Sequence, residues 1–382
     1  MNQKSVARPE YAAENLYVSC NICHVNPMGG GLRNSNGKIF GSRDMELSPF
    51  SKNEWFQVDF RAPFQRATTS RNEETKGIAV MNTLVAAHLP ILKDSEDQET
   101  TGFVVSNSFG VLDNGLHEAY ALIRIGGPQL LIGRFYVPFG LATDEHRTYT
   151  RLQTRTTVKD FETGLAVSGD LTSSFHYDFS VTSGLDNDSS GNAIAATDSP
   201  YGLAGNLRWK PFPQPHFFGL SYLVHGTTLV PSPIEATSIN FVSATNQMTN
   251  NKFKGSVLFE FVSSKGFNNN LLNSNISYFI PATDPWKDSV ASSRAQGLNF
   301  GLNWSLSTRL IFQFKLEQFT PDVDYSGDKF TRTGCGIKYF FNSNMNLLAR
   351  FEKSTASRPG LTEAGTVSAV KDYFYAIFHL WI

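Results

Sequence analysis

The chain has 382 residues, a net charge of -1 and a charged fraction of 18%, below the roughly 25% of average soluble domains. Its 31 Phe, 13 Tyr and 5 Trp residues exclude an intrinsically disordered chain, because such chains lack aromatic side chains. The near-zero charge gives no indication of a nucleic-acid partner, and no apolar run approaches the ~18 residues that a transmembrane helix needs.

The first chemical signal along the chain is a C-x-x-C-H motif formed by Cys20, Cys23 and His24. At this spacing two thiols can add to the vinyl groups of a haem while the next imidazole binds its iron. A zinc site would need two more ligands nearby, and residues 1–51 contain no other Cys or His. A disulfide stays open as an alternative, and Cys335 is expected to be a packing residue. We therefore expect one covalently bound haem c, with His24 as the proximal iron ligand.

The second axial ligand of such a haem has several candidates. Met45 lies far enough beyond His24 to cross the ring and is the preferred one, whereas Met28 would need a tight turn. Met81 and His88 lie farther along the chain. Ordinary packing is the alternative interpretation for each methionine.

The rest of this N-terminal segment is glycine-rich and short. The glycines of residues 25–41 let the backbone pass close to a flat macrocycle. Arg33 and Lys38 are candidates to neutralise haem propionates, or else they are exposed loop charges. Residues 1–51 are too few for a free-standing cytochrome, so we expect this haem segment to plug the structure formed by residues 52–382.

From about residue 52 onward the chain alternates between large apolar residues and small or polar ones. Period two places the two sets on opposite faces of a β-strand. Such segments begin near residues 54, 77, 101, 117, 129, 161, 174, 201, 217, 237, 253, 272, 298, 310, 333, 346 and 371. One of them places Leu310, Phe312, Phe314 and Leu316 on one face and Ile311, Gln313, Lys315 and Glu317 on the other.

A large soluble β-sandwich also has alternating strands, but the charges on the second face suit a wet lumen better. Glu260, Lys315 and Glu317 belong to this face. At about 20 residues per strand and turn, we expect an all-β fold, a transmembrane antiparallel β-barrel of about 16 strands in the bacterial outer membrane, in contact with its lipid. The aromatic-rich end of the chain resembles the closing strand of such barrels, although its last residue is Ile382 and the aromatic Trp381 stands one place earlier.

A second local resemblance spans residues 133–141, which read G-x-x-x-x-P-F-G-L. This stretch resembles a segment of phosphate-selective-type porins. It is followed by the basic stretch of His146, Arg147, Arg151 and Arg155. A plain turn at the barrel rim explains the Pro-Phe-Gly equally well.

As an architecture, a C-x-x-C-H segment ahead of a porin-sized barrel resembles the outer-membrane cytochrome–porin fusions, including the monohaem iron-oxidising cytochromes. This resemblance implies electron transfer between an extracellular donor, such as ferrous iron, and a periplasmic cytochrome or other electron carrier. Two alternatives remain: a diffusion porin for small anions or solutes with an N-terminal plug, and a sheath around a separate multihaem cytochrome. A lumen closed by residues 1–51 favours electron transfer, and an open lumen favours diffusion.

Export is a requirement of both the haem and the membrane hypotheses. Residues 1–19 contain no apolar core of a signal peptide. We therefore expect the numbered chain to be the mature form.

Overall fold

The computed structural model describes the greater part of the chain. The described residues are 19–20, 23–28, 32–34, 37, 55–69, 74–78, 82–93, 99–110, 115–141, 148–152, 154, 156, 160–185, 200–211, 215–227, 234–244, 255–266, 294–307, 309–321, 323, 329–342, 344–356 and 370–381. Within these ranges, no helix combines the length and the apolar character needed to cross a membrane.

The described residues form seventeen β-strands and one helical turn, α3 (Tyr149–Leu152). The strands are β1 (Phe56–Thr69), β2 (Glu74–Ile78), β3 (Asn82–Lys93), β4 (Glu99–Phe109), β5 (Gly115–Arg124), β6 (Gln129–Tyr136), β7 (Phe161–Thr172), β8 (Phe175–Leu185), β9 (Pro200–Trp209), β10 (His216–Thr227), β11 (Ile234–Ala244), β12 (Gly255–Lys265), β13 (Arg294–Ser305), β14 (Leu310–Thr320), β15 (Phe330–Asn342), β16 (Met345–Ala356) and β17 (Val370–Trp381). The predicted strand near residue 272 lies outside the described residues.

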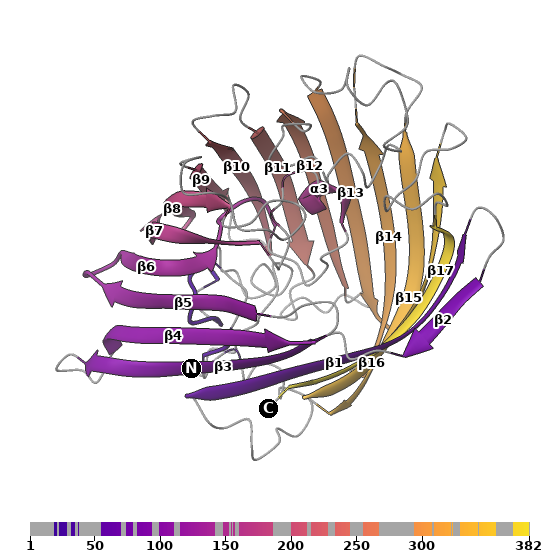
Figure 1. The fold of residues 1–382 in the computed structure, drawn as a ribbon, viewed down its shortest axis with the longest axis horizontal. Helices are drawn as coiled ribbons and strands as arrows, with labels where there is room; N and C mark the ends of the chain where they lie inside the picture. Colours follow the sequence, from indigo (N-terminus) through magenta and orange to yellow (C-terminus); the bar gives the residue numbers. More distant parts are fainter. Residues whose placement is uncertain are drawn as a thin grey trace.

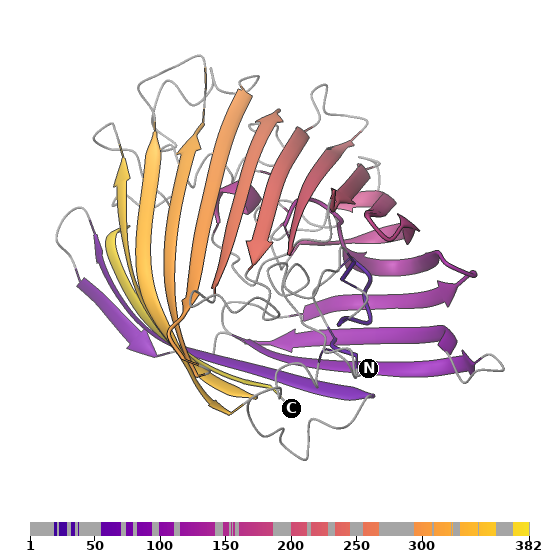
Figure 2. The same cartoon turned by 180° about the vertical axis from the view of Figure 1, so that it is seen from behind.

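The strands close into one antiparallel barrel (Figures 1 and 2). From β3 onward each strand pairs with the next, and β1 pairs with β17 from Asp59↔Trp381 to Thr69↔Val370. On its other edge β1 pairs first with β3 and then with β2. β2 and β3 therefore lie end to end and together occupy the place of one strand in the barrel wall. Counted in this way, the barrel has sixteen strands. Closure leaves no free strand edge.

The two ends of the barrel differ in the length of their connections. The start of β1 and the end of β17 lie at one end, where the connections include the short turns 125–128 and 173–174. The opposite end carries the long connections 137–160 and 266–293. Because outer-membrane barrels have short periplasmic turns and longer extracellular loops, the first of these ends is the periplasmic one.

The two faces of the wall differ as the sequence predicts. In β14 the alternate residues Gln313, Lys315 and Glu317 are only 7%, 5% and 0% exposed and face inward. Phe312 and Phe314 between them are partly exposed on the outer face, and large apolar side chains such as Leu220 and Trp304 are exposed in the same way. An apolar exterior around a polar interior is the arrangement that a lipid bilayer requires. The prediction of an all-β barrel of the bacterial outer membrane is confirmed.

Candidate functional site: a lumen narrowed from two sides

The connection 137–160 has its described residues inside the barrel. Its described residues Val137 and Phe139 pack with Leu223 and Val262 on the inner faces of β10 and β12. Leu141 belongs to a neighbouring cluster on the same wall. The Pro-Phe-Gly sequence is therefore not a turn at the rim, which was one of the two interpretations of this motif. It lies inside the lumen because its apolar side chains cover apolar positions on the wall.

Gly140 marks the point at which this connection meets the wall. Its φ of 62° lies in the left-handed region, which glycine adopts without steric cost. A Cβ at this position would collide with the carboxylate of Glu260 and the guanidinium of Arg151. The Gly140 amide donates a hydrogen bond to Ser221 Oγ at 2.9 Å. The glycine thus allows the backbone to approach a buried ion pair closely.

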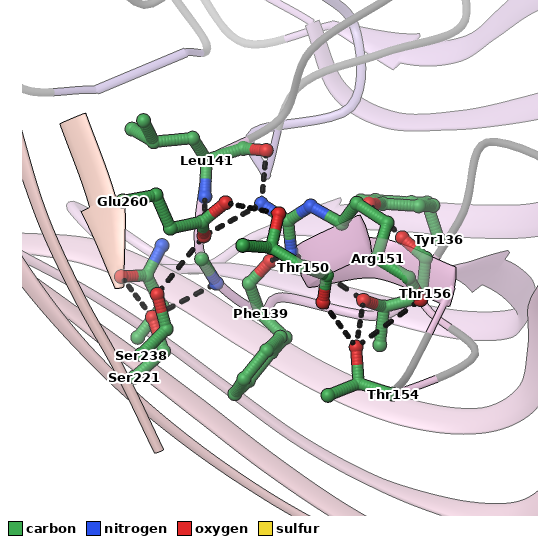
Figure 3. A network of polar contacts seen from close by, with 12 residues as sticks. Tyr136, Phe139, Leu141, Thr150, Arg151, Thr154, Thr156, Ser221, Ser238 and Glu260 are labelled. Atoms are coloured by element: carbon green, nitrogen blue, oxygen red, sulfur yellow. Dashed lines mark hydrogen bonds and ion pairs between the residues drawn. The ribbon is translucent and has the colours of Figure 1, made fainter. Parts of the chain in front are cut away.

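That ion pair joins Arg151 of α3 to Glu260 of β12 at 3.0 Å (Figure 3). Glu260 is 1% exposed, and its carboxylate also accepts hydrogen bonds from Leu141 N at 3.0 Å, Thr150 Oγ1 at 3.1 Å and Ser238 Oγ at 2.9 Å. The Arg151 guanidinium donates in addition to the carbonyls of Phe139 and Leu141. A buried charge pair is tolerated only when its remaining donors and acceptors are satisfied in this way.

A second anchor holds α3 against β14 and β15. The Tyr149 amide donates to Glu317 Oε1 at 3.1 Å, and the Arg332 guanidinium lies 4.4 Å from the centre of the Tyr149 ring. Glu317 also pairs with Arg332 at 3.0 Å and with Lys315 at 2.9 Å. The connection therefore contacts the lumen wall at two separate places. We call the contacts of Leu141, Thr150 and Arg151 with Glu260 the Glu260 anchor, and those of Tyr149 with Glu317 and Arg332 the Glu317 anchor.

The two anchors limit what the predicted basic stretch can do. Arg151 is neutralised by Glu260 and is 2% exposed. Its charge therefore holds the connection against the wall and is not presented to a ligand in the lumen. His146, Arg147 and Arg155 lie outside the described residues. Within the described part of the chain, no group of three His, Cys, Asp or Glu residues has the arrangement of a metal site. The described residues of this connection thus lie against the lumen wall through one apolar contact surface and two sets of charged and polar contacts.

The described N-terminal residues also lie against the inner wall, beside β5 and β6 in both views (Figures 1 and 2). The amides of Cys23 and His24 donate to the Cys20 carbonyl at 3.1 and 3.0 Å, which closes a backbone turn. Both hydrogen bonds end on Cys20, so the backbones of the three motif residues lie close together, and His24 continues into an antiparallel bridge with Arg33. Cys23 is 0% and His24 8% exposed, and all three cysteines of the chain are free of disulfide bonds.

The other residues predicted for a haem site are placed as follows. Met28 lies in an apolar cluster with Tyr120 and Leu122 of β5. The Arg33 guanidinium lies 4.3 Å from the centre of the Trp381 ring. His88 Nε2 is 2.7 Å from Glu99 Oε1. Met45, Lys38 and Met81 lie outside the described residues.

One group of lumen residues at the motif was missed by the sequence reasoning. Arg208 of β9 donates to Cys20 Sγ at 3.0 Å and to Asp178 of β8 at 2.5 Å. Asp178 also accepts from Ser168 at 2.7 Å and lies 3.0 Å from His176 Nε2. The alternation of the strands could have indicated them, because Arg208 of β9 and Asp178 of β8 both stand at positions whose side chains face the lumen.

Comparison with known proteins identifies similar folds but assigns the chain to no family. No family model and no curated protein matches the chain. The fold is similar to that of an anion-selective porin from Comamonas acidovorans, with a TM-score of 0.56, 9% identity, and coverage of 85% of this chain and 98% of that one.

Two further similar structures are the outer-membrane channel DcaP of Acinetobacter baumannii and Salmonella typhi OmpF in complex with daunomycin. The TM-scores are 0.57 and 0.58, each at 10% identity. Both cover 86% of this chain, and they are themselves covered to 96% and 97%. At these identities the similarity shows a porin-like fold alone.

Proposed function

We propose that this protein is an outer-membrane diffusion channel for small hydrophilic solutes. The observation that supports the proposal is the connection 137–160, whose described residues are fixed inside a closed barrel by the Glu260 and Glu317 anchors. A polar lumen lets hydrated solutes cross the apolar band of the membrane. The fixed loop sets the largest solute that passes.

Charge on one sector of the lumen wall, formed by β14 to β16, favours anions among these solutes. The inner faces of β14 to β16 carry the cations Lys315, Arg332, Lys338 and Arg350 against the two anions Glu317 and Glu352. An excess of one sign in a confined passage raises the local concentration of the opposite ion. The name of the Comamonas acidovorans relative describes an anion-selective porin, which agrees with this preference.

Liposome swelling with uncharged sugars of increasing size tests the diffusion function. The unaltered protein should admit the smallest sugars and exclude larger ones. The double variant Glu260→Ala, Glu317→Ala removes both anchors and should raise the size limit, while the lipid-facing Leu220→Ala should leave it unchanged. A barrel that is correctly inserted but admits no sugar would contradict the proposed function. An unchanged size limit in the double variant would show that the loop does not set it.

A second candidate function, electron transfer, rests on the backbone turn at the C-x-x-C-H motif. The hydrogen bonds from the Cys23 and His24 amides to the Cys20 carbonyl keep the three motif residues close together, and this proximity supports covalent haem attachment with His24 as the proximal iron ligand. A haem bound there would supply a one-electron carrier within the barrel. Electrons would then pass between an extracellular donor and a periplasmic carrier, and Met45 stays the preferred second ligand.

Intact mass and visible absorption of the protein, purified from cells that mature c-type cytochromes, test this second function. Attachment should add the mass of one haem, and the Soret band should survive acid-acetone extraction. The double variant Cys20→Ala, Cys23→Ala should lose both signals. An unmodified mass in the unaltered protein would eliminate electron transfer and leave the diffusion channel as the single proposal.

A further inference from the structure

One sector of the lumen wall is apolar, although the interior of an outer-membrane barrel is ordinarily polar. Neighbouring inward positions from β3 to β7 form this sector, and all of them are buried. We call it the apolar wall patch; its residues are Ala86, Val104, Tyr120, Leu122, Leu131, Phe135 and Ala166. Such a surface is unfavourable against water in an open passage.

The patch is covered by the N-terminal segment of the same chain. Val25, Met28 and Leu32 pack in one cluster with the patch residues. Their exposures of 4%, 4% and 0% match those of a protein core. Burial of this kind is the main favourable term in docking one part of a protein on another. The segment therefore lies on a surface whose composition complements its own.

Polar contacts fix the same segment to four strands around the lumen. They come from both its side chains and its backbone, so they specify one position rather than general adhesion. The contacts are Asn26 Nδ2 to Glu118 Oε1 of β5 at 3.0 Å, Arg33 N to Gln57 Oε1 of β1 at 3.1 Å, Cys20 Sγ to Arg208 of β9 at 3.0 Å, and the Arg33 guanidinium over the Trp381 ring of β17 at 4.3 Å.

The segment also has its own local fold. His24 and Arg33 form an antiparallel bridge, and Val25 N donates to the Leu32 carbonyl at 3.0 Å. The backbone N–H of Asn34 donates to the Cys23 carbonyl at 2.9 Å. Gly37 lies so close to the same carbonyl that a Cβ on residue 37 would collide with its oxygen. A folded unit loses less conformational entropy on docking than an extended chain does.

We propose that the N-terminal segment, through its described residues 19–20, 23–28 and 32–34, is an internal plug that docks on the apolar wall patch and restricts the channel. This inference rests on the proposed diffusion function and adds a regulatory element to it. The connection 137–160 narrows the lumen from β10, β12, β14 and β15, and the plug narrows it from β1, β5, β9 and β17. Displacing the plug leaves the barrel wall intact and widens the passage.

Two readouts on one set of variants test the plug. The buried thiol of the native Cys23 is the reporter, in protein refolded without haem and with Cys335 replaced by serine, and peptide mass resolves its labelling from that of Cys20. The release variant adds Met28→Asp and Leu32→Asp, which place charges against the apolar patch. The matched control adds Asn303→Asp on the inner face of β13. Labelling by a membrane-impermeant maleimide reports docking, and conductance in planar bilayers reports flow.

In the background and the control, the reporter should react slowly and conductance should stay low. In the release variant labelling should accelerate by about tenfold or more, as expected when a protected local state is opened, and conductance should rise. Rapid labelling in the background, or a release variant that conducts measurably but no more than the background does, would overturn the plug. If no variant conducts although the release variant is labelled rapidly, the diffusion function fails while docking is still observed.

Discussion

Substituting Phe314 by Arg tests the membrane register of the barrel. Phe314 lies midway along β14, partly exposed on the outer face, opposite Leu302 of β13 and Cys335 of β15. Its ring makes an edge contact with Phe300, with the ring centres 6.4 Å apart. Arginine at the bilayer midplane costs about 2–4 kcal/mol, and the lost aromatic pair adds about 0.5–1.5 kcal/mol. We expect Phe314→Arg to lower the free energy of unfolding by about 2.5–5.5 kcal/mol in total.

Equilibrium unfolding in phospholipid vesicles, followed by tryptophan fluorescence, measures this loss. Phe314→Leu separates the two contributions, because it removes the ring pair and adds no charge; it should cost about 1 kcal/mol. Asn303→Arg places the same charge on the inner face of neighbouring β13, where water reaches it, and should cost less than about 1 kcal/mol. Equal costs for arginine at positions 314 and 303 would refute the assignment of outer and inner faces.

Three other substitutions address the lumen. Gly140→Ala should displace the connection from the Glu260 anchor, because its Cβ has no space at a φ of 62°; single-channel recordings should show higher and noisier conductance, and an unchanged trace would contradict the anchor. Arg332→Ala removes one partner of a buried pair and should lower barrel stability by about 3–5 kcal/mol, measured by the same unfolding assay. Lys338→Gln with Arg350→Gln removes two lumen cations and should lower anion preference, and a reversal potential equal to that of the unaltered protein would argue against these residues.

The barrel could be predicted because its strands carry a local signal. Alternation of apolar and polar residues fixes both the strand and its orientation, and the predicted starts near 129, 161 and 310 agree with β6, β7 and β14. The sequence did not predict that β2 and β3 share the place of one strand beside β1. The alternation of residues near position 77 carries no sign of where the pairing with β1 is interrupted. Periodicity reports which side a residue faces and not how far its hydrogen bonds continue.

The inward fold of the connection 137–160 could not be predicted, because its anchors are distant in sequence and the connection itself has no period. Arg151 and Glu260 are 109 residues apart, and nothing local distinguishes this carboxylate from other inward charges. The same reason hid Arg208, whose contact with Cys20 spans 188 residues. The C-x-x-C-H motif was visible from spacing alone, and its covalent chemistry stays a prediction.

Recording the unaltered protein in a planar bilayer with a salt gradient tests the central claim most directly. The claim is that a polar lumen, narrowed by a loop and carrying excess cations on its β14 to β16 sector, lets small solutes diffuse across the outer membrane. It predicts discrete conductance steps and a reversal potential displaced toward the equilibrium potential of the anion. Inserted barrels that give no conductance steps under any applied voltage would contradict it.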